Sequence, residues 1–211
     1  MSRKRAHSGV FITFEGIDGC GKSTQLVKSA ALLKDIGFSV VTLREPGSTR
    51  IAEQIRRILL HTREPLSDVT ELLLYEAARA EITAHEIRPH LAAGRIVLCD
   101  RFFDSTTAYQ GYGRKLDLTL VKELHALAVG DTRPDLTLVL DVDLKTAFAR
   151  RGKKLDRLES QSRAFFNRVR RGYREIARLE PRRVQLINAS GTIDQTFDLV
   201  RPLIFATLKG T

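Results

Sequence analysis

The chain has 211 residues, of which 43% are apolar, and its 35 Lys and Arg residues against 25 Asp and Glu give a formal net charge of +10. No apolar run approaches the ~20 residues of a membrane-spanning helix, and two cysteines exclude a disulfide framework. We therefore expect one cytoplasmic domain over residues 10–211. It should follow a basic extension over residues 1–9 that lacks the apolar region of a signal peptide.

Five apolar, strand-like runs alternate with segments of helical periodicity. The predicted strands are Val10–Phe14, Phe38–Leu43, Ile96–Cys99, Leu136–Leu140 and Val184–Ile187. The predicted helices are Lys22–Ile36, Ile51–Leu60, Asp68–Arg88, Leu118–Val129, Leu144–Arg151, Gln161–Leu179 and Ile193–Lys209. Gly37 is expected to end the first helix, and Asp68 with Glu71 predicts a capping box. The alternation predicts an α/β fold, a five-stranded parallel sheet with helices on both faces.

The first predicted strand leads directly into a glycine-rich loop, in the sequence FITFEGIDGCGKST from Phe11 to Thr24. It matches the phosphate-binding loop (P-loop) pattern GxxxxGK[ST] from Gly16 to Ser23, between a strand and a helix as the pattern requires. Glycines let successive N–H groups converge on phosphate oxygens, and the following helix adds the positive end of its dipole. The pattern predicts a P-loop NTPase-type fold that binds a nucleoside triphosphate with Mg²⁺. The expected binding residues are Gly16, Ile17, Asp18, Gly19, Cys20, Gly21, Lys22, Ser23 and Thr24.

Within this pattern Lys22 is expected at the β- and γ-phosphates, Ser23 at Mg²⁺ and Thr24 at the helix start. The third predicted strand runs into Asp100, at the carboxyl edge where α/β sheets bind ligands, which suits a second magnesium-related position. A carboxylate that only caps the following loop is the alternative. Arg101 comes next, where a guanidinium can clamp a second phosphate group bidentately.

The positive charge admits nucleic acid, acidic lipid or a polyphosphate substrate as partner. Basic residues concentrate from Arg150 to Arg183, alternate there with acidic residues, and are accompanied by few aromatics for base stacking. We therefore expect a segment that handles phosphate, together with solvated helix faces, and neither a nucleic-acid nor a membrane partner.

One histidine pair imitates a zinc-binding helix. His85 and His90 are five residues apart, about 140° around a helix, whereas zinc-binding pairs lie four apart on one face. Pro89 is also expected to end that helix. We expect no metal at these histidines.

Six short strings, in order along the chain, resemble bacterial thymidylate kinases. They are FEGIDGCGKST, REPGST from Arg44, YEAAR from Tyr75, DRFFDSTTAYQG from Asp100, DRLE from Asp156 and FFNRVRRGY from Phe165. The resemblance covers about 11–205. It implies phosphoryl transfer from ATP to dTMP with Mg²⁺, making dTDP on the way to dTTP, and a homodimer formed through long helices, the one predicted from Asp68 among them.

The resemblance also implies an acceptor site. Tyr75 takes the place where the family usually has a Phe stacked on thymine, and Tyr keeps the stacking face. Arg79 would bond the base and Arg101 the phosphate. From the residues alone, the better interpretation of Tyr75 and Arg79 is a helical i, i+4 pair with one member buried and one solvated. The remaining implied residues are Asp18 at the 3′-hydroxyl, Glu45 and Pro46 between sugar and phosphate, Ser105 and Gln110 at base and deoxyribose, and Tyr109 against a 2′-hydroxyl.

No general base stands out, and the implied chemistry explains why. A nucleoside monophosphate attacks through a phosphate oxygen that is largely ionised at neutral pH, since its second pKa is about 6. What remains is to align two polyanions and neutralise the charge of the transferring group.

A short charged segment, GKKLDRLE from Gly152, breaks the rhythm of the helices and predicts a lid over about 150–160. The family has one subtype with an Arg in the phosphate loop and one with basic residues in the lid. Gly19 occupies the loop position here, so the resemblance implies a catalytic arginine in the lid. Arg151 is the first choice and Arg157 the second, unless Arg157 is held in a structural ion pair with Asp156 or Glu159.

Three other readings compete with this one. Another nucleoside monophosphate kinase would differ only in its acceptor. A phosphate-loop switch or nucleic-acid ATPase would need a guanine-reading NKxD string, or Glu after Asp100, and the chain has neither. A non-catalytic nucleotide-binding module would have a damaged loop, whereas Lys22, Ser23 and Asp100 are intact.

Overall fold

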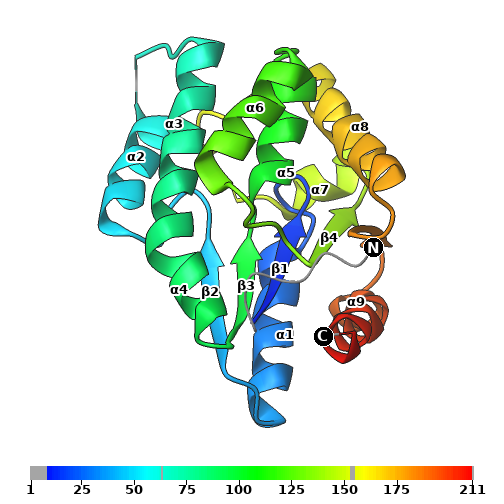
Figure 1. The fold of residues 1–211 in the computed structure, drawn as a ribbon. Coiled ribbons are helices and arrows are strands. Elements are labelled where there is room, and N and C mark those ends of the chain that lie inside the picture. The colour runs from blue at the N-terminus through cyan, green and yellow to red at the C-terminus, as the bar shows by residue number, and fades with distance from the viewer. Residues whose placement is uncertain (1–8, 63, 153–154, 211) are drawn as a thin grey trace.

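The computed structural model describes residues 9–62, 64–152 and 155–210 as a parallel sheet surrounded by helices (Figure 1). The strands are β1 (Val10–Glu15), β2 (Val40–Arg44), β3 (Ile96–Asp100), β4 (Leu136–Asp141) and β5 (Val184–Asn188). The helices are α1 (Lys22–Asp35), α2 (Arg50–His61), α3 (Asp68–Ile82), α4 (Arg88–Ala92), α5 (Phe103–Thr106), α6 (Leu118–Val129), α7 (Leu144–Arg150), α8 (Arg163–Leu179) and α9 (Ile193–Lys209). Two π-helical segments are η1 (Thr83–Ile87) and η2 (Thr107–Gly113). Residues 1–8 of the expected extension, and Lys153 and Lys154 of the expected lid, lie outside the described residues.

The strand order is β2-β3-β1-β4-β5, and every pairing is parallel, which confirms the predicted fold. All six residues of the central strand β1 are buried, as a strand covered on both faces requires. Alternate side chains enter different clusters: Ile12 packs with residues of α1 and α9, and Phe11 with residues of α3, α4 and α6. No helix within the described ranges is long and apolar enough to cross a membrane.

The second strand begins two residues later than predicted. Phe38 belongs to the turn that ends α1, where its N–H donates to Leu33 O at 2.9 Å, and its side chain is 42% exposed. Gly37 adopts φ 95° in this turn, as expected of a helix-ending glycine. The strand β2 therefore begins at Val40, the first residue that pairs with β3, and the apolar character of Phe38 does not mark its start.

The predicted capping box at Asp68 and Glu71 is wrong. Ser67 caps α3, because its hydroxyl accepts the N–H of Thr70. Asp68 is already helical, and the Glu71 carboxylate is buried among partners from other elements.

The prediction that Pro89 ends the third helix is also wrong. The chain widens into η1, in which the N–H of Arg88 donates to Thr83 O, and then continues as α4. Pro89 lies in the first turn of α4, where a missing N–H costs no helical hydrogen bond.

Sequence periodicity missed the helical stretch of α5 and η2, which follows β3. Its residues FDSTTAYQGYG carry β-branched side chains and glycines, which favour helix weakly. Packing on α8 stabilises it instead: a Cβ on Gly113 would lie 2.7 Å from Phe165, and a Cβ on Gly172 of α8 would lie 2.8 Å from Tyr112. This close approach places Ser105 and Tyr109 one helical turn apart beside the phosphate loop.

Candidate active site

The glycine-rich loop between β1 and α1 has the backbone geometry of an anion cradle. Gly16, Gly19 and Gly21 adopt φ values of 131°, 84° and 97°, which residues with a Cβ rarely adopt. A Cβ on Gly19 would also lie only 2.1 Å from Ala147 O. Gly21 is the N-cap of α1 and supplies no side-chain cap, so the first N–H groups of α1 are left for a ligand.

A cavity of about 460 Å³ opens at this loop. The loop and the start of α1 form one wall, and the segment from Ala189 to Thr196 forms another. It is lined by Gly19, Cys20, Gly21, Lys22, Ser23, Thr24, Gln25, Arg150, Ala189, Gly191, Thr192, Ile193 and Thr196. Six of the nine expected loop residues are therefore here, while Gly16, Ile17 and Asp18 are not part of this lining. Sequence reasoning missed the wall after β5, because no local motif marks it.

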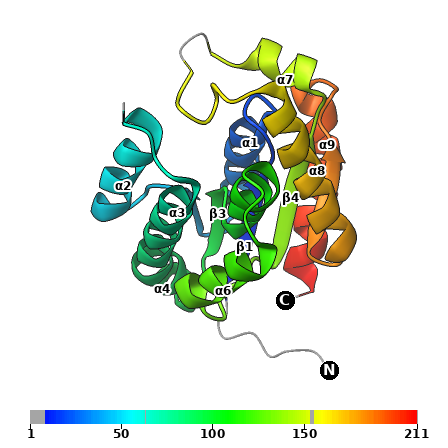
Figure 2. The same ribbon diagram turned by 90° about the horizontal axis from the view of Figure 1, so that it is seen from above.

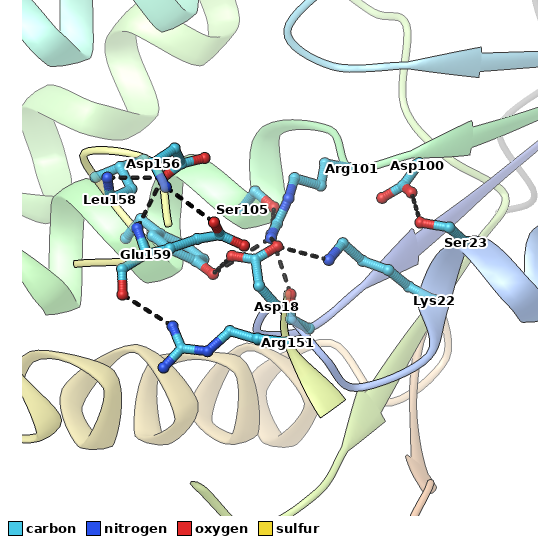
Figure 3. A network of polar contacts seen from close by, with 12 residues as sticks. Asp18, Lys22, Ser23, Asp100, Arg101, Ser105, Arg151, Asp156, Leu158 and Glu159 are labelled. Carbon is cyan, nitrogen blue, oxygen red and sulfur yellow. Dashed lines mark hydrogen bonds and ion pairs between the residues drawn. The ribbon is translucent and has the colours of Figure 1, made fainter. Parts of the chain in front are cut away.

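Ser23 and Asp100 meet at the edge of the sheet, as expected. The Ser23 hydroxyl donates to Asp100 Oδ2 at 2.5 Å, while Asp100 Oδ1 is buried without a hydrogen-bond partner (Figure 3). A hydroxyl and an unpaired carboxylate oxygen are hard oxygen ligands, the kind that Mg²⁺ takes when waters and substrate phosphates complete its shell. These two residues therefore fit such a site. No cluster of three or more His, Cys, Asp or Glu suited to a metal occurs among the described residues.

Asp18 lies between the two expected phosphate-binding cations (Figure 3). Its Oδ1 accepts Lys22 Nζ at 3.1 Å and Arg101 Nη2 at 2.6 Å. Burial alone would raise the pKa of Asp18, but the charges of Arg101 and Lys22 hold it below its usual range. One ionised carboxylate thus keeps both cations in place at the edge of the sheet.

Arg101 is fixed by its backbone as well as by Asp18. Its φ is 74°, an uncommon conformation for a residue with a side chain, and its N–H donates to Phe14 O at 3.0 Å. The guanidinium donates to Gly16 O at 3.0 Å and lies 5.1 Å from the Tyr109 ring centroid. The arginine expected at the acceptor phosphate is therefore pre-positioned beside the phosphate loop.

A second cavity, of about 80 Å³, begins on the other side of Asp18. It is lined by Asp18, Glu45, Pro46, Arg56, Leu60, Tyr75, Arg101, Ser105, Thr106, Tyr109, Gln110, Asp156 and Leu158. The structure thus brings together eight of the nine residues expected at the acceptor. Sequence reasoning missed Arg56, Leu60, Thr106, Asp156 and Leu158. The DRLE string contains the last two, but its expected place was the lid.

Arg79 is the expected acceptor residue that does not line this cavity. It is 1% exposed, and its guanidinium donates to Glu45 at 2.9 Å, Glu76 at 2.7 Å and Thr106 Oγ1 at 2.9 Å. Burial raises the pKa of Glu45 to about 8, an effect that Arg79 opposes and Glu76 reinforces. Arg79 therefore does not line the cavity itself. It contacts Thr106, which does.

Glu15, the last residue of β1, lies behind Arg101. It is fully buried and accepts the Phe102 N–H at 2.7 Å, the Ser105 hydroxyl at 2.6 Å and the Tyr173 hydroxyl at 3.0 Å. Burial, reinforced by Asp104, raises the pKa of Glu15 to about 7. The sequence contained this residue in the FEG string without indicating its part in holding Phe102 and Ser105.

The described part of the expected lid separates its two candidate arginines. The segment after α7 extends toward α2 (Figure 2). Arg151 stacks 3.6 Å from the Phe148 ring centroid, donates to Glu159 O at 2.9 Å, and has its Cγ 3.1 Å from where a Cβ on Gly19 would stand. Arg157 donates to Leu59 O at 2.8 Å and pairs with Glu71. Arg151 is therefore beside the phosphate loop, while Arg157 is anchored to α2 and α3.

Comparisons with known proteins give consistent matches. A family model described as thymidylate kinase matches residues 14–200. The chain is 46% identical over 202 residues to a thymidylate kinase of Chlorobium luteolum, covering 90% of this chain and 94% of that protein. It is 51% identical over 185 residues to one of Desulforudis audaxviator, covering 86% and 84%. Its fold matches a crystal structure of thymidylate kinase from Ehrlichia chaffeensis with a TM-score of 0.78 at 37% identity, over 93% of this chain and 98% of that one.

Glu15 generates a prediction about pH. Between its ordinary pKa near 4.5 and the folded value of about 7, the unfolded chain has released this proton while the folded chain keeps it, so this group makes stability fall as pH rises. Glu15→Gln removes that dependence. Its unfolding free energy relative to wild type should increase by about 3 kcal/mol from pH 5 to pH 8 in urea titrations. Any constant cost of the substitution leaves this slope unchanged. Parallel curves for the two proteins would contradict the assignment.

Proposed function

We propose that this chain, which belongs to the thymidylate kinase family and phosphorylates dTMP to dTDP with ATP, holds its two nucleotides in the two cavities described above. The observation that supports this proposal is the row Lys22, Asp18, Arg101 at the boundary between them. ATP occupies the cavity of the phosphate loop, with its base beyond Arg150. dTMP occupies the cavity of Tyr75, and the two phosphate ends meet at the row.

The transfer needs no general base in this arrangement. An ionised phosphate oxygen of dTMP attacks the γ-phosphorus of ATP, a new P–O bond forms, and the bond to the bridging oxygen of ADP breaks with its electron pair. Lys22 and Arg101 stabilise the charge on the transferring group and its acceptor. Asp18 gives up these two cations to the incoming phosphates and turns to the 3′-hydroxyl of the acceptor sugar.

Ser23 and Asp100 hold Mg²⁺ in this proposal, as their oxygen chemistry supports. When bound, Mg²⁺ neutralises charge on the β- and γ-phosphates. The Ser23 hydroxyl, which donates to Asp100 Oδ2, and the unpaired Oδ1 of Asp100 are the oxygen atoms of this chain that would hold the ion.

The acceptor cavity carries two arginines, which suits a dianionic phosphate. Arg101 clamps this phosphate, and Arg56, whose Nη1 donates to Pro46 O at 2.8 Å, supplies a second charge. Tyr75 stacks on the thymine, Ser105 and Gln110 line base and deoxyribose, and Tyr109 crowds a 2′-hydroxyl. Arg79 supports the base through Thr106 instead of reaching it freely.

A homodimer formed through α3 and α6 is part of the proposal. Val69 and Leu73 are about half exposed, one turn apart on α3, and Leu120 and Leu127 are exposed on α6, which packs against α3. Exposed apolar side chains on adjoining helices mark association surfaces. We also place the enzyme in the cytoplasm, since Cys20 and Cys99 are both free and buried.

The acceptor assignment is tested by a coupled ADP-release assay across a monophosphate panel. dTMP should be preferred over dUMP, because a 5-methyl contact is worth about 1 kcal/mol, and both over UMP, because Tyr109 crowds the 2′-hydroxyl. If UMP, CMP or GMP were the best acceptor, the chain would be another nucleoside monophosphate kinase.

The phosphate loop is tested by Lys22→Ala. This variant should abolish transfer, because it removes the charge that acts on the β- and γ-phosphates, and its circular dichroism spectrum should be unchanged.

The lid generates a separate prediction. Arg151→Ala should lower kcat by ~10³-fold with little change in the KM for dTMP, because an arginine beside Gly19 acts mainly on the transition state. Arg163→Ala is the matched control, since Arg163 is an exposed arginine near the same Phe148 ring. Single-turnover rates decide the matter. Normal chemistry in Arg151→Ala and in Arg157→Ala alike would leave Lys22, Arg101 and the metal as the source of the stabilising charge.

The proposed interface is tested by Leu73→Glu. A charge at the centre of an apolar contact is desolvated without a partner, so this variant should be a monomer in light scattering at concentrations where wild type is a dimer. Val27→Glu, at a similarly exposed apolar residue of α1, should leave the dimer intact. A monomeric wild type, or a dimeric Leu73→Glu, would rule out this interface.

A further inference from the structure

Glu71 of α3 is a buried carboxylate that has no role in the reaction described above. Its side chain is 1% exposed, yet three cationic or amide groups converge on it. Gln110 Nε2 donates to its Oε1 at 2.7 Å, and Arg114 donates to Oε1 at 3.2 Å and to Oε2 at 3.0 Å. Arg157 Nη2 lies 2.6 Å from Oε2 and forms an ion pair with it.

These partners come from two different parts of the chain. Gln110 belongs to η2, Arg114 follows η2 directly, and Arg157 belongs to the segment between α7 and α8. Gln110 lines the acceptor cavity, and so do Asp156 and Leu158, the two neighbours of Arg157. One carboxylate therefore holds two separate walls of the acceptor cavity.

The charge of Glu71 also fixes the orientation of the Gln110 amide. Burial alone would raise the pKa of Glu71, but the hydrogen bonds from Arg114 and Gln110 and the charges of both arginines lower it. An ionised carboxylate only accepts hydrogen bonds, so Gln110 must turn its NH₂ group toward Glu71. Its Oε1 is then the atom that remains to accept a hydrogen bond from a ligand.

We propose that Glu71 is a positioning residue for the acceptor nucleotide. It orients Gln110 and, through Arg157, holds the Asp156 and Leu158 wall against the same cavity. The inference rests on the acceptor site proposed above. Because neither wall belongs to the ATP cavity, the loss of Glu71 should act on dTMP binding and leave ATP binding unchanged.

The test is a double-mutant cycle between Glu71→Gln and Gln110→Ala, read in steady-state kinetics. Each single change should raise the KM for dTMP roughly tenfold, as expected when a charge-assisted hydrogen bond or the group that it holds is lost. The KM for ATP should change less than about twofold. The double variant should show roughly a thirtyfold increase and not the hundredfold increase of independent sites.

Two further variants make the cycle decisive. Asp141→Asn is the matched control, since Asp141 also holds two arginines, Arg170 and Arg174, but lines neither nucleotide cavity. It should leave the KM for dTMP within about twofold of wild type. Glu71→Asp keeps the charge near Arg114 and Arg157 but shortens the reach to Gln110, so it carries the same prediction if Glu71→Gln does not fold.

The possible results separate this inference from the acceptor site itself. If Gln110→Ala leaves the KM for dTMP unchanged, the proposed acceptor site is wrong and the inference fails with it. If Gln110→Ala raises this KM but the Glu71 variants do not, only the inference fails. Fully independent effects, or equal increases in both KM values, would show that Glu71 merely stabilises the fold.

Discussion

The contact of one carboxylate, Asp18, with two cations, Lys22 and Arg101, is the constraint around which the site is built. Like charges brought together at the edge of the sheet repel one another, and an ionised Asp18 between them offsets that repulsion. The parallel pairing of β1 and β3 makes the contact possible. Phe14 pairs with Asp100, so the chain leaves both strands at the same edge.

Acidic side chains hold other parts of the site in place as well. Three parts of the proposed nucleotide sites are each backed by an acidic side chain, which is half-buried for Asp18 and buried for Glu15 and Glu71: Arg101 by Asp18, the Phe102 to Ser105 turn by Glu15, and Gln110 by Glu71. Buried carboxylates are costly unless several donors satisfy them, and each of these accepts from more than one donor. The high positive charge of the chain thus coexists with a fixed arrangement of cations, because acids hold the guanidinium groups in place before any nucleotide binds.

Local patterns predicted the parts of the site that depend on local backbone chemistry. The glycines of the phosphate loop, Lys22, Ser23 and the Asp100–Arg101 pair follow from short motifs at strand ends, and the alternation of elements yielded the sheet. Contacts between distant segments could not be predicted in this way. Ser67 and not Asp68 caps α3, and the helical path continues through η1 and past Pro89. Residues 103–113 are helical because they pack on α8. In these places tertiary contacts outweigh local preference. Glu71 and Thr106 gained their places from partners more than twenty residues away.

The proposed arrangement places two nucleotides on either side of the Lys22, Asp18 and Arg101 row, with their phosphates meeting there. A crystal structure with a bisubstrate analogue, adenosine and thymidine joined by five phosphates, tests it most directly. We expect adenine beside Arg150 and Thr192, thymine against Tyr75, and the phosphate chain contacting Lys22 and Arg101 with Asp18 released from both. Thymine outside the Tyr75 cavity, or Asp18 still bonded to both cations beneath the bound phosphates, would contradict it.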